Sequence, residues 1–421
     1  TRADSRRERT EDCAEEKAKC WIPLETRWDK TTSVKRFRKK YGNNENIAKN
    51  ILNTITNPLT FEMIQRLSDP TKYSNAIDDI NTKLHINKDD GDDEVDESKM
   101  DNDKDKAYYN IKTTEASEMR AYNSWVKETL IKNFSKKSWV LDWGVGQGGD
   151  VSKYIHAGIN IIGIDPDANG LYSAEGAISR YKNMKKKLKS EVEMEFIHIN
   201  PSILFENQDN MGTEDNQLLI KNQLLERKDK FDGMAAMYSF HYNFESTETL
   251  NNAINNMKSR LASGAKVVII CFDGKELHSK LKKAKGTLKL DYVSVSDKVI
   301  NLFSIKKTYS EKVYSKIQTG AAIDVHNSIF MEEGAVETEY IVPPKLLTST
   351  MKKAGFKIVE TDMIDSLYDQ KYFEDKFAKE TVSSLKTRYS KILSYGTSDT
   401  SEMKACKAWN ALFRYYIFEK K

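Results

Sequence analysis

A glycine-rich turn carries the residues whose types and spacing point most directly to chemistry. Residues 140–150 read Val-Leu-Asp-Trp-Gly-Val-Gly-Gln-Gly-Gly-Asp, so Gly144, Gly146 and Gly149 have the spacing GxGxxG. Glycines let the backbone approach a ligand closely, because no Cβ stands in the way. A second apolar run ends at Asp165, whose carboxylate can accept both hydroxyls of an adenosine ribose.

This pattern is shared by dinucleotide-binding folds and by methyltransferases that use S-adenosyl-L-methionine (AdoMet). Asp142, two residues before the first glycine, distinguishes a dinucleotide site from an AdoMet site. A carboxylate there would repel a pyrophosphate and attract the amino group of AdoMet. The turn therefore predicts an AdoMet site. A dinucleotide site and a structural glycine turn without a ligand are the alternatives.

Strands and helices alternate on both sides of this turn. Apolar runs predict strands over 139–143, 159–164, 193–199, 231–239, 266–272 and 356–360, and helical spacing predicts helices over 119–134, up to residue 156, and over 173–188. Such alternation is typical of an α/β fold with a mostly parallel sheet and helices on both faces. Residues 273–332 show no pattern that orders their elements.

The charge of the chain is unevenly distributed. The 421 residues include 67 Lys+Arg and 63 Asp+Glu, a net charge of +4. Residues 88–106 hold ten acids and four bases, which is −6 and leaves +10 for the rest. This composition predicts a disordered acidic linker. The alternative is an acidic tether that competes with a polyanion for a basic groove. No run approaches the roughly 20 apolar residues of a membrane span, and the four cysteines lack zinc-ligand spacing. We expect neither a membrane partner nor a metal.

Four separated segments resemble the mRNA cap (guanine-N7) methyltransferase family. Residues 119–131 (MRAYNSWVKETLI) resemble its RNFNNWxKxxLI helix, the glycine turn resembles LDLGCGKGGDL, residues 239–246 (SFHYNFES) resemble FxxHYxFES, and Glu339-Tyr340 with 351–356 (MKKAGF) resemble EY…(F/M)KxxGF. Agreement in order and spacing is far more specific than one motif. The resemblance implies a Rossmann-like class I AdoMet-dependent methyltransferase fold. Residues 165–168 and 180–181 are similar to the poxvirus-type branch.

A second resemblance lies near the N-terminus, where residues 21–31 (WIPLETRWDKT) are similar to the closing RxDK motif of a capping guanylyltransferase OB domain. Together the resemblances imply part of a multifunctional capping enzyme of a large DNA virus. The expected domains are the tail of the OB domain (1–42), a helical connector (43–87), the acidic linker (88–106) and the methyltransferase (107–421), so a short α/β extension would precede the main fold. The implied partners are 5′-capped RNA, upstream triphosphatase and guanylyltransferase domains of the same polypeptide, and an activating subunit. The implied location is cytoplasmic, in a viral factory or virion.

The family resemblance also implies which residues bind AdoMet and release S-adenosyl-L-homocysteine. Lys127 would pair with the methionine carboxylate, and Asp165 would hold the ribose. Asn200 stands where the family has an adenine-contacting Asp, and an amide oxygen can still accept from the exocyclic amine. The full implied set is Lys127, Asp142, Gly144, Gly146, Asp165, Pro166, Asn200, Tyr238 and Tyr242.

The residues implied for the cap and RNA are Tyr109, Asn123, Ser124, Gln147, Lys153, Arg180, His241, Glu339 and Phe413. Glu339 matches the acid that accepts from N1 and N2 of guanine. Phe413 matches a stacking Tyr and would suit a cationic methylguanine, with an ordinary core aromatic as the alternative. Lys153 and Arg180 match cations for the triphosphate, whereas Gln147 replaces a lysine. The lysine-rich run 182–189 is either a solvated helix face or an RNA track.

The implied reaction is methyl transfer from AdoMet to guanine N7 by in-line displacement. N7 already has a nucleophilic lone pair, so we expect no general base, and His241, Tyr242 and Glu339 would act by positioning and electrostatics. One alternative is a methyltransferase for another acceptor, such as a small amine. Another alternative is a non-catalytic remnant that binds RNA or a partner. Three departures from the family pattern would indicate such a remnant: Asn200, Gln147, and Val145 in place of the usual Cys.

Overall fold

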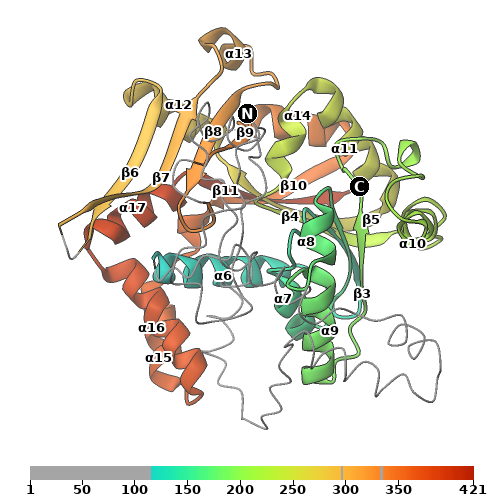
Figure 1. Cartoon of the computed structure of the whole chain (residues 1–421), viewed down its shortest axis with the longest axis horizontal. Coiled ribbons are helices and arrows are strands. Elements are labelled where there is room, and N and C mark those ends of the chain that lie inside the picture. The colour runs from blue at the N-terminus through green and yellow to red at the C-terminus, as the bar shows by residue number, and fades with distance from the viewer. Residues whose placement is uncertain (1–114, 295–296, 332–334) are drawn as a thin grey trace, which may run out of the picture. The chain divides into compact units, whose positions relative to one another are not determined.

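The computed structural model describes residues 115–294, 297–331 and 335–421 (Figure 1). The expected OB-domain tail, helical connector and acidic linker lie outside these residues, as does Tyr109. The structure describes one compact unit of the chain. This unit contains the glycine turn and all of the predicted site residues except Tyr109.

A seven-stranded sheet in the order β10-β11-β5-β4-β1-β2-β3 forms the centre of this unit (Figure 1). Neighbours among β1 to β5 pair in parallel, and β11 pairs antiparallel with both β5 and β10. This topology confirms the predicted Rossmann-like class I methyltransferase fold. The strands are β1 (Trp139–Trp143), β2 (Asn160–Asp165), β3 (Met194–His198), β4 (Phe231–Met237), β5 (Leu261–Phe272), β10 (Phe356–Met363) and β11 (Phe413–Lys420).

The chain changes direction across the sheet between β1 and β4. It runs outward from β1 to β3 on one side, then returns to β4 beside β1 and continues to β5 on the other side. In open α/β sheets, ligands bind at such a switch point, at the carboxyl ends of the strands. This geometry places the glycine turn after β1 and the segment after β4 at the same edge.

Helices cover both faces of the sheet. The buried side chains of α6 (Ser117–Ile131), α7 (Val151–Ala157) and α9 (Ala177–Leu188) belong to one hydrophobic cluster. Those of α11 (Thr247–Arg260) and α14 (Pro344–Lys353) belong to a second cluster on the opposite face. None of the helices in the described residues is long and apolar enough to cross a membrane.

The helix predicted over 173–188 begins four residues later in the structure. A short helix, α8 (Ala168–Tyr172), ends first, and α9 starts only at Ala177. Gly176 lies in the break, where an added Cβ would be 2.7 Å from the carbonyl oxygen of Gly170. The close contact between this segment and α8 prevents one continuous helix. The prediction was therefore wrong at its first turn.

A second, antiparallel sheet is formed largely by the region that no sequence pattern ordered. Its order is β6-β7-β8-β9, and β9 carries Glu339 at the edge. Helices α15 to α17 follow β10, and α16 packs on α6. The remaining elements are η2 (Phe205–Asn207), α10 (Glu214–Leu219), η3 (Ile220–Leu225), η4 (Phe240–Phe244), α12 (Gly274–Lys283), β6 (Thr287–Val293), β7 (Val299–Lys307), α13 (Glu311–Ser315), β8 (Ala322–Asn327), β9 (Glu337–Tyr340), η5 (Ile364–Leu367), α15 (Gln370–Lys379), α16 (Ser383–Thr397) and α17 (Ser401–Asn410).

Candidate active site

The turn after β1 needs glycine for its conformation and for its contacts. Gly144, Gly146 and Gly148 have φ values of 80°, 53° and 76°, in the left-handed region that favours glycine. A Cβ on Gly144 would lie 2.4 Å from the Cβ of Ser239, in the segment after β4. A Cβ on Gly148 would lie 2.9 Å from the Cα of Ala177. The spacing motif singled out the third glycine as Gly149, whereas the geometry requires glycine at 148.

Asp165 lies at the end of β2 and holds the glycine turn in place. The backbone N–H of Gly146 donates to Oδ2 of Asp165 at 2.7 Å, and the N–H of Asp167 donates to Oδ1 at 2.8 Å. Each carboxylate oxygen keeps a further lone pair, so these bonds are compatible with the predicted ribose contact. Pro166 follows at the surface, and its carbonyl oxygen lies 3.0 Å from Nε2 of His198.

Asp142 is a carboxyl group buried within β1. It is only 5% exposed. Burial, and next the charge of Asp150, raise the pKa of Asp142 to about 8, although Lys127 opposes the shift. Because an ionised carboxylate is unfavourable there without a close cation, this site would gain from a positively charged ligand.

Asp150 links the two lysines that the sequence assigned to different ligands. Its carboxylate lies 2.9 Å from Nζ of Lys127 and 3.0 Å from Nζ of Lys153. Burial alone would raise the pKa of Asp150, but the two lysines hold it well below its usual range. Burial lowers the pKa of Lys153. Sequence reasoning missed Asp150 as a site residue, although it closes the glycine turn.

His241 and Glu339 form a buried pair between the two sheets. His241 lies in η4 after β4, Glu339 lies in β9, and Nε2 is 3.1 Å from Oε2. Burial lowers the pKa of His241 to about 3, whereas burial and then Glu337 raise the pKa of Glu339 to about 8. Burial therefore favours the uncharged form of both groups, a protonated carboxyl and a neutral imidazole. The ring of Tyr242, 36% exposed, lies 4.3 Å from the imidazole.

Aromatic rings line the region beside this pair. Tyr238 has a positive φ of 67°, which is unusual for a side chain of this size and often marks a functional position. Its ring meets Phe413 edge-on at 5.1 Å, and Lys127 lies 5.3 Å from its centroid. Phe413 is 6% exposed and stacks on Phe272 at 4.3 Å. One face of the Phe413 ring is already covered, so this geometry favours an ordinary core aromatic over a ring that stacks on the cap.

Asn123 is bound to another amide. Its Nδ2 donates to Oδ1 of Asn410 at 3.1 Å, and Nδ2 of Asn410 donates back at 2.8 Å. Nδ2 of Asn410 also donates to the hydroxyl of Tyr395, which in turn donates to Asp365. The network fixes α6 against α16 and α17, so it orients Asn123. Ser124 is the next residue of α6 and is half-buried.

Two of the other predicted polar residues, Asn200 and Arg180, have local partners. Oδ1 of Asn200 accepts from the N–H of Ser202 at 2.9 Å, and Nε of Arg180 donates to the carbonyl of Glu175 at 3.0 Å. Within the part of the chain that the structure describes, the buried Oε1 of Gln147 has no hydrogen-bond partner. It is a buried acceptor in the glycine turn, at the position where the family has a lysine.

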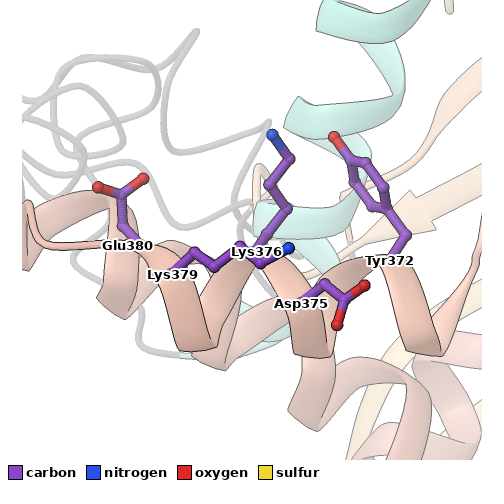
Figure 2. A pocket seen from close by; sticks show the side chains of 5 residues that line it. All are labelled: Tyr372, Asp375, Lys376, Lys379 and Glu380. Carbon is purple, nitrogen blue, oxygen red and sulfur yellow. The ribbon is translucent and has the colours of Figure 1, made fainter.

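A surface hollow on α15 lies apart from these residues. Its volume is about 420 Å³, and it is lined by Tyr372, Asp375, Lys376, Lys379 and Glu380 (Figure 2). Two acids offset two lysines, and no residue predicted for AdoMet or cap binding lines the hollow. We do not assign it to the active site.

Comparison with known proteins decides the family. A model of the mRNA (guanine-N(7))-methyltransferase domain matches residues 85–421. The chain belongs to this family.

Relatives of this methyltransferase include viral and cellular proteins. A protein named "Probable mRNA-capping enzyme" from Acanthamoeba polyphaga mimivirus is 34% identical over 423 residues, which cover 95% of this chain and 34% of the relative. An mRNA-capping enzyme of African swine fever virus is 23% identical and covers 56% of this chain and 26% of its own. The mRNA cap guanine-N(7) methyltransferase of Schizosaccharomyces pombe is 29% identical over 36% of this chain and 38% of its own. The chain thus spans about a third of the length of these relatives.

Fold and family together imply AdoMet as the cofactor, and the residues at the turn fit it. Asp142 offers a buried carboxyl with its pKa raised to about 8, which suits an ammonium group. Lys127 offers a partly buried cation for a carboxylate. Gly144 and Gly146 have positive φ values, so the turn between them carries no side chain at these two positions.

Proposed function

We propose that this methyltransferase transfers the methyl group of AdoMet to N7 of the guanosine cap of mRNA, converting GpppN-RNA to m7GpppN-RNA. One observation carries the proposal. Ser239 contacts the glycine turn, since its hydroxyl donates to the carbonyl of Trp143, and two residues later His241 contacts Glu339. A short segment therefore connects a cofactor-type turn to a buried carboxyl that can read a base.

The proposed cofactor site surrounds the turn after β1. AdoMet, when bound, supplies an electrophilic methyl group on its sulfonium sulfur. Asp142 would hold the amino group, and Lys127 would share its charge between Asp150 and the cofactor carboxylate. Asp165 and Pro166 would face the ribose. Asn200 and Tyr238 complete the proposed set, together with the backbone of Gly144 and Gly146 and the ring of Tyr242.

Glu339 is the proposed determinant of guanine specificity. Guanine presents N1–H and N2–H donors on one edge, and a carboxylate accepts from both. Adenine has an acceptor at N1, which a carboxylate repels. Glu339 must release its proton to serve as this acceptor, because burial raises its pKa to about 8. The buried imidazole of His241, 3.1 Å away, would then hold the carboxylate in place.

No residue is assigned as a general base. The N7 lone pair of guanine is the nucleophile, and the bond from the methyl carbon to N7 forms as its bond to the sulfonium sulfur breaks. No proton moves in this step. The protein contributes by holding the two reactants in line. We therefore assign His241, Tyr242 and Glu339 to positioning of the base.

The phosphates and the wider partners complete the proposal. Lys153 and Arg180 would contact the triphosphate. The side-chain NH2 of Gln147 would add a neutral donor from the turn, whereas its carbonyl oxygen, buried and unpartnered within the described residues, cannot donate to a phosphate. The viral relatives are named mRNA-capping enzymes and are longer than this chain, which supports triphosphatase and guanylyltransferase domains elsewhere in one larger polypeptide. The viral origin of these relatives supports a viral setting, which we propose to be cytoplasmic. An activating subunit is proposed on the poxvirus-type resemblance alone.

The test is transfer of labelled methyl from AdoMet to GpppA and to capped RNA. We expect label in both acceptors and at least a 100-fold loss in Glu339→Ala, whose AdoMet binding should be unchanged by calorimetry. A matched control is Glu337→Ala, an exposed residue of the same strand. Binding of AdoMet without transfer to either acceptor, tested also with the full capping polypeptide, would contradict the proposal. Failure to bind AdoMet would favour the non-catalytic alternative.

A further inference from the structure

A small cavity lies on the face of the main sheet opposite to Phe413. Phe413 belongs to the hydrophobic cluster of α6 and α7, whereas Tyr416 belongs to that of α11 and α14. The cavity has a volume of about 210 Å³ and shares no residue with the candidate active site. Its walls come from the starts of α12 and α14 and from β10 and β11, through Asp273, Lys275, Pro344, Lys345, Thr348, Thr361, Arg414 and Tyr416.

Tyr416, which lines this cavity, carries a buried hydroxyl without a partner in the described residues. Tyr416 is 1% exposed, and its phenol oxygen has no hydrogen-bond partner within the described residues. Leaving such a group unsatisfied costs about 1–3 kcal/mol, so each case in a folded protein needs an explanation. Burial raises the pKa of Tyr416, which keeps the hydroxyl protonated and able to donate. A bound acceptor would satisfy it.

The charged groups around the cavity favour an anion. Lys275, Lys345 and Arg414 contribute three positive charges against the single carboxylate of Asp273. That carboxylate is already engaged, because Oδ1 accepts from the N–H of Glu276 at 2.9 Å and Oδ2 accepts from Nε of Arg414. The terminal nitrogens of Arg414 can still donate to a ligand.

Two helices also begin at the cavity. Both α12 and α14 are ten residues long, and Asp273 and Pro343 are their N-caps. The positive end of a helix dipole favours an anion at this position. The hydroxyls of Thr348 and Thr361 donate to backbone carbonyls at 2.8 and 2.7 Å. They make the wall of the cavity polar, but neither can donate its proton to a ligand.

The size of the cavity limits the anion. Its volume of about 210 Å³ is below the roughly 300 Å³ at which sites for whole small molecules begin. A single tetrahedral oxyanion fits this volume. We propose that this cavity is a second, phosphate-binding site, in which Tyr416, Arg414 and the two lysines hold a single phosphate group.

Two sources could provide this phosphate: a backbone phosphodiester of the RNA substrate, or free inorganic phosphate. The RNA source rests on the proposed function, because it requires the RNA to continue from the cap to this face. Binding of free phosphate does not depend on that function. The experiments therefore measure the two separately.

The first experiment follows thermal unfolding with and without inorganic phosphate at constant ionic strength. We expect phosphate to raise the Tm of the wild type and to raise that of Tyr416→Phe and Lys345→Ala much less. Without phosphate, Tyr416→Phe should unfold at the same or a higher temperature, since it removes an unsatisfied hydroxyl. Lys353→Ala, at the other end of α14 and outside the cavity, is the matched control and should respond like wild type. Equal phosphate shifts in all four proteins would overturn the proposal.

The second experiment compares GpppA with a capped RNA of about 20 nucleotides. If the RNA supplies the phosphate, Lys345→Ala should raise the Kd for capped RNA by about threefold to tenfold and lower the salt dependence by roughly one phosphate contact. Its Kd for GpppA should stay unchanged. A lost phosphate response with unchanged RNA binding would support the site and assign it to free phosphate. Absence of methyl transfer in the wild type would contradict the proposed function without changing the phosphate result.

Discussion

Binding of a guanine cap should tighten as the pH rises from 6 to 8, because Glu339 must lose its proton to accept from N1 and N2 of the base. The carboxyl belongs to β9 and faces His241 of η4, and burial raises its pKa to about 8. The neighbouring imidazole of His241 has its pKa lowered to about 3, so it provides no compensating charge in this range.

The size of the effect follows from the fraction of ionised carboxyl. With a pKa of about 8, about one carboxyl in a hundred is ionised at pH 6, about one in eleven at pH 7 and about half at pH 8. The Kd for a guanine cap should therefore fall by about fiftyfold from pH 6 to pH 8, which is about 2.3 kcal/mol. In the unliganded protein this carboxyl has the opposite effect on folding stability, which decreases as the pH rises. The unfolded chain loses this proton near its usual pKa of 4.5, so this carboxyl makes stability fall as the pH rises from there to about 8.

The assay is calorimetric titration of GpppA into protein saturated with S-adenosyl-L-homocysteine, at pH 6, 7 and 8 and constant ionic strength. The bridging triphosphate of GpppA has no monoester phosphate that titrates in this range. Glu339→Gln should show weaker binding at pH 8 and no pH dependence. A flat profile in the wild type, or an equal slope in Glu339→Gln, would refute the assignment of Glu339 to the base.

Three further substitutions test the turn and its charges. Gly144→Ala should destabilise the fold by about 3 kcal/mol by urea unfolding and abolish AdoMet binding, since its Cβ would meet Ser239. Gly264→Ala has a similar φ with open space around it, so it should cost only about 1–2 kcal/mol, and equal losses would contradict the packing argument. Asp142→Asn should weaken AdoMet binding about 100-fold, which corresponds to about 2.7 kcal/mol, yet leave the unliganded Tm at pH 9 equal or higher, because it removes a buried charge. A lower Tm there would count against burial as the cause of its raised pKa. Asp150→Asn should lower the free energy of unfolding by about 3–5 kcal/mol, since it leaves two cations without their shared partner, and a loss below about 1 kcal/mol would show that solvent screens both pairs.

Six of the seven strands of the main sheet were predictable, most of them because they are short apolar runs buried on both faces. The strand β11 was not predicted, and β10 is largely exposed. The run at 139–143 coincides with β1, and the others differ from the structure by a few residues at their ends. The second sheet was not predictable. Its strand Thr287–Val293 is largely exposed, and an exposed antiparallel strand has no long apolar run to mark it. That sheet places Glu339 opposite His241, two residues that only the family resemblance assigned to one site.

The site was predictable to the extent that its residues belong to motifs. The sequence singled out Asp142, Asp165 and Lys127, but it gave no indication that Lys127 and Lys153 share Asp150. Such pairing depends on how α6 packs against α7, which spacing along the chain does not encode. The glycine pattern likewise left open which glycines have a positive φ.

The most direct test of the account is the order in which labelled methyl is transferred to dinucleotide caps that differ only in the terminal base. Guanosine presents two donors to Glu339, inosine keeps N1–H and lacks the N2 amine, and adenosine presents neither. We predict that methyl is transferred roughly tenfold faster to the guanosine cap than to the inosine cap, which is about the contribution of one hydrogen bond to a charged group. Transfer to the adenosine cap should be almost absent. Equal transfer to guanosine and adenosine caps would contradict the claim that a buried carboxyl of the second sheet selects the base beside the cofactor turn.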